Sequence, residues 1–141
     1  MEQTVLISIS GTQQFMGERP ETIQLVTHGA YRYEPGAIQI SYAETEMTGM
    51  EGVFTTFTVE DGAVSLTRTG KVSSCMEFRL GQKHESLYNA GFACLLIGVT
   101  ATRMTVLLNE HGGIFDLEYD VEVEHTACGT NSYHIELKPT E

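Results

Sequence analysis

A carboxylate shares a predicted strand face with two isoleucines. Residues 38–46 read IQISYAETE, and side chains in a strand alternate between two faces, so Glu44 would point the same way as Ile38, Ile40 and Tyr42. A charged group on an apolar face suits a catalytic acid, an anchor for a ligand or one half of a buried ion pair. The position of Glu44 therefore raises the question of its partner.

Arg68 supplies a matching charge on a second predicted strand. In residues 63–70, AVSLTRTG, it follows Val64 and Leu66 on one face. A single charge buried alone costs several kcal/mol, of order 3–5 when one partner of a buried pair is removed. We therefore expect Glu44 and Arg68 to meet inside the fold, where the planar guanidinium can hold a carboxylate bidentately.

Three interpretations of this pair remain open. The pair could be structural and fix the register of the strands. It could be the polar anchor of a cavity that binds a mostly apolar ligand, with the hydroxyls of Tyr42 and Tyr88 assisting. It could also be catalytic, with Glu44 as base and Arg68 as anion clamp. However, the sequence has no second carboxylate or histidine at a spacing that would indicate a catalytic pair.

The elements that position these residues are predicted to be strands, because a period of two runs along the whole chain. Residues 114–124, IFDLEYDVEVE, alternate almost without error between apolar and acidic side chains, which is typical of a half-buried antiparallel strand. Glycine turns separate such runs, including EPGA at 34–37 and EDGA at 60–63. Only residues 11–20, GTQQFMGERP, favour a short helix or a long loop.

This pattern predicts an all-β fold, a closed antiparallel lipocalin-like or calycin-like β-barrel of about 8–10 strands, with residues 1–141 as a single domain. Closure removes the exposed edges that an open sheet would leave. The side chains expected to point inward are those of Ile38, Ile40, Tyr42, Leu66, Phe78, Ile97, Leu117 and Tyr119.

The composition of the chain argues against some classes of binding partner. The chain has 141 residues, with eight basic and 19 acidic side chains and a net charge of −11. A surface this negative repels nucleic acid and anionic membranes. The N-terminus carries an acid where a secretory signal needs bases, no window reaches about 18 apolar residues, and three cysteines lack a CxxC motif. We expect a cytoplasmic protein.

Metal and thiol chemistry have little support. His125, Cys128 and His134 lie within ten residues and could approach a zinc ion, but no second close pair of ligands accompanies them. We expect no metal and no cofactor. Cys94 is predicted to be a buried structural thiol, and Cys75 to face outward without a neighbouring base.

Short landmarks resemble the YwiB-like family of small bacterial proteins. They are YAE at 42–44, RTG at 68–70, YNAGF at 88–92 and LEY at 117–119, and they recur in order over almost the whole chain. The resemblance implies a calycin-like barrel of eight to ten strands, and it implies no established reaction or ligand. The matching positions are Tyr42, Glu44, Arg68, Gly70, Gly91 and Tyr119.

We predict a non-enzymatic barrel that binds a small, partly apolar molecule, with Glu44, Arg68, Tyr42, Tyr88 and Tyr119 as ligand-binding residues and no catalytic residue. One alternative is a homodimeric interaction module that uses its outer sheet or residues 47–54 and has a filled barrel. The other is a hydrolase or isomerase that uses Glu44. An interior packed solid by side chains would contradict ligand binding.

Overall fold

The computed structural model of the chain describes residues 2–45, 50–71, 73–89 and 93–140. The described residues form ten antiparallel strands, which confirms the all-β prediction. The strands are β1 (Glu2–Phe15), β2 (Glu21–Glu34), β3 (Ala37–Ala43), β4 (Val53–Glu60), β5 (Ala63–Gly70), β6 (Ser74–Phe78), β7 (Lys83–Asn89), β8 (Cys94–Asn109), β9 (Gly112–Val123) and β10 (Thr126–Pro139).

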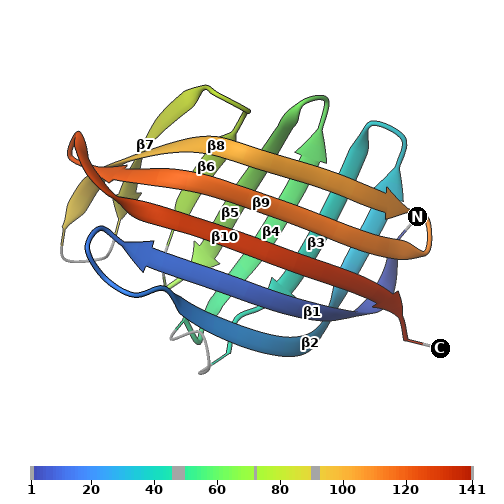
Figure 1. Cartoon of the computed structure of the whole chain (residues 1–141). Helices are drawn as coiled ribbons and strands as arrows, with labels where there is room; N and C mark the ends of the chain where they lie inside the picture. Colours follow the sequence, from blue (N-terminus) through green and yellow to red (C-terminus); the bar gives the residue numbers. More distant parts are fainter. Residues whose placement is uncertain (1, 46–49, 72, 90–92, 141) are drawn as a thin grey trace.

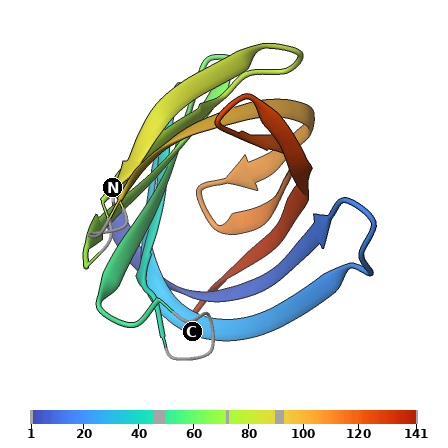
Figure 2. The same ribbon diagram turned by 90° about the vertical axis from the view of Figure 1, so that its left-hand side faces the viewer.

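All ten strands belong to one sheet, in which the first and last strands pair with each other. The order is β6-β5-β4-β3-β2-β1-β10-β9-β8-β7, so β6 and β7 are the two edges. The strands β1, β8, β9 and β10 run across the front of the molecule, and β3, β4 and β5 lie behind them at a steep angle (Figure 1). Viewed from the end, the sheet curls around a common axis (Figure 2). The predicted barrel is therefore confirmed.

The two edges of the sheet meet at a seam with little pairing. In the part of the chain that the structure describes, the seam carries two isolated bridges, an antiparallel one between Arg79 and Gln82 and a parallel one between Leu80 and Ala101. The amide of Gly81 also donates to the carbonyl of Ala101 at 3.0 Å. The barrel is thus closed by a few contacts instead of a continuous ladder.

Inward side chains of β3–β6 form three rows across the sheet. The first row is Ile38, Val59, Val64 and Phe78, and the second is Ile40, Phe57, Leu66 and Met76. The third row is Tyr42, Thr55, Arg68 and Ser74. Two apolar rows fill the core, and the third row is polar, so the core ends where the polar residues begin.

The predicted inward residues lie in the core or pack against it. Ile40, Tyr42, Leu66, Phe78, Leu117 and Tyr119 are buried, and Ile38 and Ile97 are partly buried against them. Aromatic rings join the two sides of the barrel, because the ring of Phe57 lies edge-on to Phe115 and to Tyr133 with centroids 5.7 and 5.5 Å apart. Such edge-to-face pairs stabilise a core beyond the area that they bury.

The prediction of a helix or loop at residues 11–20 is wrong for its first half. The strand β1 continues to Phe15, because it is paired on both sides: Gly11 lies opposite Ile23 on β2 and Tyr133 on β10. Only after Phe15 does the chain turn toward β2. This end of β1 lacks the usual apolar alternation because it does not border the apolar core.

The prediction that Cys94 is buried is also wrong. Cys94 is exposed at the start of β8, and Cys75 is exposed as predicted. The reason is the uneven length of the strands: β9 reaches β8 only as far as the pair Val123–Ile97. Residues of β8 before Ile97 therefore extend beyond the core.

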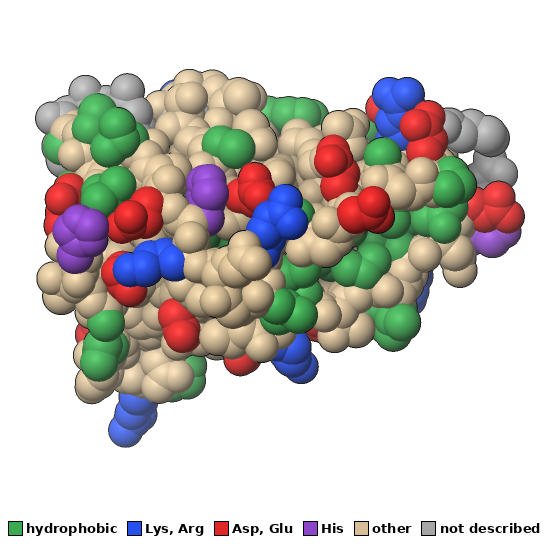
Figure 3. Space-filling view, turned by 90° about the horizontal axis from the view of Figure 1, so that it is seen from above, with side chains coloured by type: hydrophobic (Ala, Val, Ile, Leu, Met, Phe, Trp, Pro, Cys, Tyr) green, Lys and Arg blue, Asp and Glu red, His purple; other side chains and the backbone are tan. Residues whose placement is uncertain are grey.

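The outer surface shows no single patch of charge from above. Acidic and basic side chains are interspersed with apolar ones over this face (Figure 3). Among the described residues, no helix is long and apolar enough to cross a membrane.

Candidate functional site: a cavity beyond the polar row

A cavity of about 150 Å³ lies beyond the third row, between residues of β1, β2, β3, β5 and β10. Its lining combines apolar, amide, hydroxyl and charged side chains. Elsewhere, a cavity of this order holds a benzene-sized molecule. The barrel is therefore not packed solid at this end.

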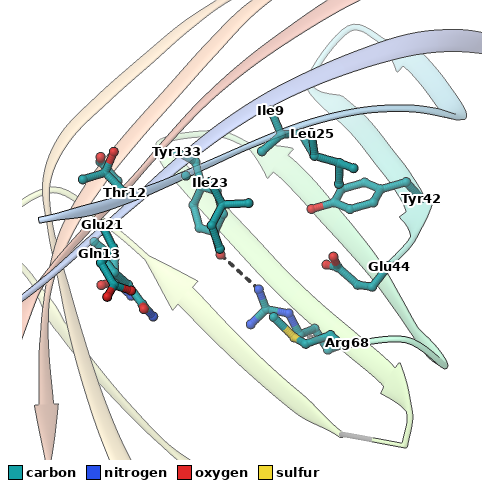
Figure 4. Close-up of a pocket in the computed structure, with 14 residues that line it drawn as sticks. Ile9, Thr12, Gln13, Glu21, Ile23, Leu25, Tyr42, Glu44, Arg68 and Tyr133 are labelled. Atoms are coloured by element: carbon teal, nitrogen blue, oxygen red, sulfur yellow. Dashed lines mark hydrogen bonds between the residues drawn. The ribbon is translucent and has the colours of Figure 1, made fainter. Parts of the chain in front are cut away.

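Arg68 reaches across the cavity from β5. It is only 8% exposed, and its Nη2 donates a hydrogen bond of 3.0 Å to the hydroxyl of Tyr133 on β10 (Figure 4). Burial alone would lower the pKa of the guanidinium, but Tyr133, Tyr119 and the charge of Glu44 favour the charged form more strongly, so the pKa is raised. Arg68 is thus a fixed cation in the interior.

Glu44 is held at the end of β3. It is 6% exposed, and its carboxylate accepts a hydrogen bond of 2.5 Å from the hydroxyl of Thr55, which is fully buried. Its amide donates to the carbonyl of Val53 at 2.9 Å. Both the backbone and the side chain of Glu44 are therefore positioned by β4.

The sequence predicts that Glu44 and Arg68 meet inside the barrel. The structure brings both into one cavity and positions each through a different neighbour, Thr55 for Glu44 and Tyr133 for Arg68. Figure 4 shows the carboxylate and the guanidinium facing the same space from neighbouring parts of the sheet. Their charges stabilise each other, and the space around them is part of the cavity.

Tyr42 lies beside Glu44 in the lining. Burial, followed by the negative charge of Glu44, raises its pKa well above the ordinary value, so the hydroxyl remains protonated. The ring has room because Gly29 is its neighbour on β2: a Cβ there would lie 2.4 Å from Ile7 Cδ1 and 3.2 Å from Tyr42 Cβ. Tyr42 can therefore occupy this position only because residue 29 has no side chain.

The other two predicted tyrosines lie elsewhere. Tyr119 is buried behind the cavity wall, where its ring stacks on Tyr133 with centroids 6.4 Å apart and packs on Phe78 at 4.5 Å. It supports Tyr133 and is not part of the lining. Tyr88 pairs with Leu95 between β7 and β8, is partly exposed, and is not brought to the cavity.

The apolar wall comes from β1 and β2. Ile9, Ile23 and Leu25 line it, and Gly11 leaves the space between Ile23 and Tyr133 open. A Cβ at Gly11 would meet the Tyr133 ring only at 3.7 Å, which is an ordinary contact. The glycine therefore contributes to the open volume of the cavity, and a larger side chain would fill part of it.

Several lining residues were missed by the sequence reasoning. Tyr133, Asn131 and Gln13 line the cavity, and Thr55 positions Glu44. The signal that could have found them is the one that found Arg68, a polar side chain in the inward phase of an apolar alternation. Tyr133 precedes Ile135 and Leu137 in that phase, and Thr55 lies between Val53 and Phe57.

The histidines and cysteine considered for zinc are not brought together. On the outer face, His134 Nδ1 contacts Asp116 at 2.5 Å and Nε2 contacts Glu136 at 3.1 Å. These two carboxylates raise the pKa of His134. His125 lies 3.4 Å from Glu85, and no group of three metal-ligating residues occurs among those that the structure describes.

Fold and cavity define this chain as an antiparallel ten-stranded β-barrel with a partly open cavity at one end, lined by both polar and apolar residues. It belongs to the family described as Domain of unknown function (DUF1934), which matches residues 7–135. Its structure is similar to the crystal structure of the ywiB protein from Bacillus subtilis, with a TM-score of 0.75, 18% identity, and coverage of 96% of this chain and 92% of that chain. At this identity, the likeness shows the fold alone. No curated protein matches the chain.

The family resemblance predicted from short landmarks is therefore confirmed. The structure explains why the landmark at 68–70 ends in glycine. Gly70 has a φ of +107°, and a Cβ there would lie 2.2 Å from the carbonyl oxygen of Gly52. Only glycine fits that position. Gly91 lies outside the described residues.

Proposed function

We propose that this barrel binds a small, partly apolar molecule in the cavity and does not catalyse a reaction. The observation that carries the proposal is the cavity itself, which places buried charges at one end and Ile9, Ile23 and Leu25 along its wall. Ligand sites in proteins have this character, with a mainly apolar lining and a few polar groups that fix orientation.

The lining supports binding over catalysis. Of the described residues that line the cavity, none is a histidine or a cysteine, and the second carboxylate, Glu21, is exposed. We also propose that the protein resides in a reducing cytoplasm, where Cys75, Cys94 and Cys128 would remain free thiols.

Gly11 provides the test. Gly11→Val adds a side chain that is favourable in a strand and projects into the cavity, whereas Gly11→Ala adds a methyl in ordinary contact with Tyr133. Native mass spectrometry of freshly purified protein should show an added non-covalent mass in the wild type and in Gly11→Ala, and none in Gly11→Val. If the wild type is bare, NMR titration with the small acids and amides named below decides.

A second candidate is self-association, and exposed apolar side chains favour it. Phe15, Met16 and Ile23 are 45%, 68% and 46% exposed at one end of β1 and β2. The segment 47–54 considered from the sequence lies partly outside the described residues. Sedimentation at several concentrations tests this candidate: a monomer throughout would remove it, and a dimer broken by Phe15→Ser would support it.

A further inference from the structure

The Nε–H group of Arg68 has no acceptor. Among the described residues, none accepts a hydrogen bond from it, although the side chain is more than nine-tenths buried. A buried donor without a partner costs about 1–3 kcal/mol, and such groups are rare in folded proteins. An unpaired donor on a buried cation, at the wall of a cavity, indicates an acceptor supplied by a ligand.

The surroundings of Arg68 restrict that acceptor. Tyr133 accepts from Nη2, which has two N–H groups, so a ligand oxygen on Nε–H would lie beside this hydrogen bond. Arg68 is the only cationic side chain among the described residues that line the cavity, and Glu44 and Glu21 share the lining with it. Either anion would meet the same cation and two carboxylates, and a monocarboxylate adds less negative charge beside those carboxylates than a dianionic phosphate does.

We propose that the ligand is a small organic monocarboxylate, whose carboxylate binds the Nε edge of Arg68 and whose apolar body lies against Ile9, Ile23 and Leu25. This inference rests on the proposed function. A carboxylate matches the fork of a guanidinium, and the apolar wall begins across the cavity from Arg68 (Figure 4). The ligand thereby completes the hydrogen bonding of the buried arginine.

Matched acids and amides test the proposal. Benzoate and hexanoate are titrated into the ¹⁵N-labelled protein beside benzamide and hexanamide, with inorganic phosphate as a third class. Each acid should bind about tenfold or more tightly than its amide, because charge-assisted hydrogen bonds exceed neutral ones. The Arg68 Nε–H resonance should shift with the acids, and phosphate should leave it unchanged.

Variants locate the effect. Arg68→Lys keeps the charge but loses the fork, and it should remove most of the preference for acid over amide. Arg68→Met should abolish that preference. Arg103→Met is the matched control, because Arg103 is exposed and lies outside the lining, and it should bind as the wild type does. If Arg68→Met does not fold, the Arg68→Lys variant and the wild-type Nε–H shift decide.

The outcomes separate this inference from the proposed function. Acids and amides that bind equally well, and are both excluded by Gly11→Val, would overturn the carboxylate and leave a ligand-binding cavity. Phosphate that shifts the Nε–H resonance more than the acids do would replace the carboxylate by another anion. No binding of any probe, with no added mass in the native protein, would overturn both proposals.

Discussion

At the scale of single residues, one hydroxyl holds the buried carboxylate in place. Thr55 is fully buried and donates to Glu44, and it also lies beside Arg68 in the polar row. A carboxylate buried without its donors is costly because it has left water without replacing its hydrogen bonds. The stability of the barrel should therefore depend on this small side chain.

The change Thr55→Val removes the hydroxyl and keeps the shape. We expect it to lower the free energy of unfolding by about 1–3 kcal/mol, since it leaves the Glu44 carboxylate without this donor. Urea unfolding measures the loss. The same change made in Glu44→Gln should cost clearly less, so a double-mutant cycle with no coupling would contradict the assigned contact.

Buried tyrosines make a pH prediction. Burial raises the pKa of Tyr31 to about 12 and, with the charges nearby, those of Tyr42 and Tyr119 further still. A raised pKa stabilises the fold fully below the unfolded value of 10.0 and less as the pH rises above it. Stability should thus fall above about pH 10.

Tyrosinate absorbance and circular dichroism, followed together, test this prediction. The ionisation of the buried tyrosines should coincide with unfolding, and Tyr42→Phe should make the loss of stability with pH less steep. Early ionisation of all six tyrosines in a folded protein would contradict it.

The candidate site was partly predictable at this scale. A charge in the inward phase of an alternation identified Glu44 and Arg68, because strand alternation is local. The hydrogen-bond partners were not predictable, because Tyr133 is 65 residues from Arg68 along the chain and meets it only through the curvature of the barrel. Alternation likewise assigns Tyr88 to a face of its strand but gives no position along the barrel axis, so its separation from the cavity could not be predicted.

At the scale of elements, close contact between strands depends on glycine. Gly29 on β2 faces Ile7 on β1 and the Ser41 carbonyl on β3, and a Cβ would lie 2.4 Å from an atom of each. Gly11 on β1 has no such neighbour, since its Cβ would meet Tyr133 at 3.7 Å. The two glycines thus form a natural comparison.

We expect Gly29→Ala to lower the free energy of unfolding by about 1–3 kcal/mol, because the added methyl overlaps a backbone oxygen that cannot move alone. Gly11→Ala should be neutral or stabilise by about 0.5 kcal/mol, since alanine has less chain entropy to lose. Thermal unfolding of both variants makes the comparison, and equal effects would contradict the difference in space.

The outer face of β9 and β10 carries a pH-sensitive contact. Hydrogen bonds first to Asp116 and then to Glu136 raise the pKa of His134. Because the pKa is raised, this contact stabilises the fold fully below the unfolded pKa of 6.5 and fades as the pH rises through the folded value. NMR titration should give His134 a pKa above 6.5, and Asp116→Asn should lower it.

The number and type of the elements could be predicted well, because alternation and glycine turns are local signals. Their lengths were less accessible. The extension of β1 to Phe15 depends on partners on β2 and β10, and the exposure of Cys94 depends on where β9 ends. Both are set by distant strands, and no nearby residue records them.

At the scale of the whole molecule, the barrel has a weak seam. Among the described residues, the seam carries two isolated bridges, Arg79–Gln82 between the ends of β6 and β7 and Leu80–Ala101 to β8, whereas the strands that are neighbours in the sheet pair in ladders. We expect amides of β6 and β7 to exchange with solvent faster than those of β9 and β10, because local opening follows the elements with fewest contacts. Hydrogen-exchange mass spectrometry measures this, and uniform protection around the barrel would contradict it.

The pairing of β1 with β10 also decides how the chain can fold. These strands include Val5 and Pro139, which lie opposite each other, and the Thr140 hydroxyl reaches the Thr4 carbonyl across 136 residues. The meander from β2 to β6 can form from neighbours in sequence, but the centre of the sheet needs β1 and β10, which are far apart in sequence. Contacts this distant slow folding. During synthesis, the edge of β1 that pairs with β10 must therefore stay without its partner until β10 has been translated.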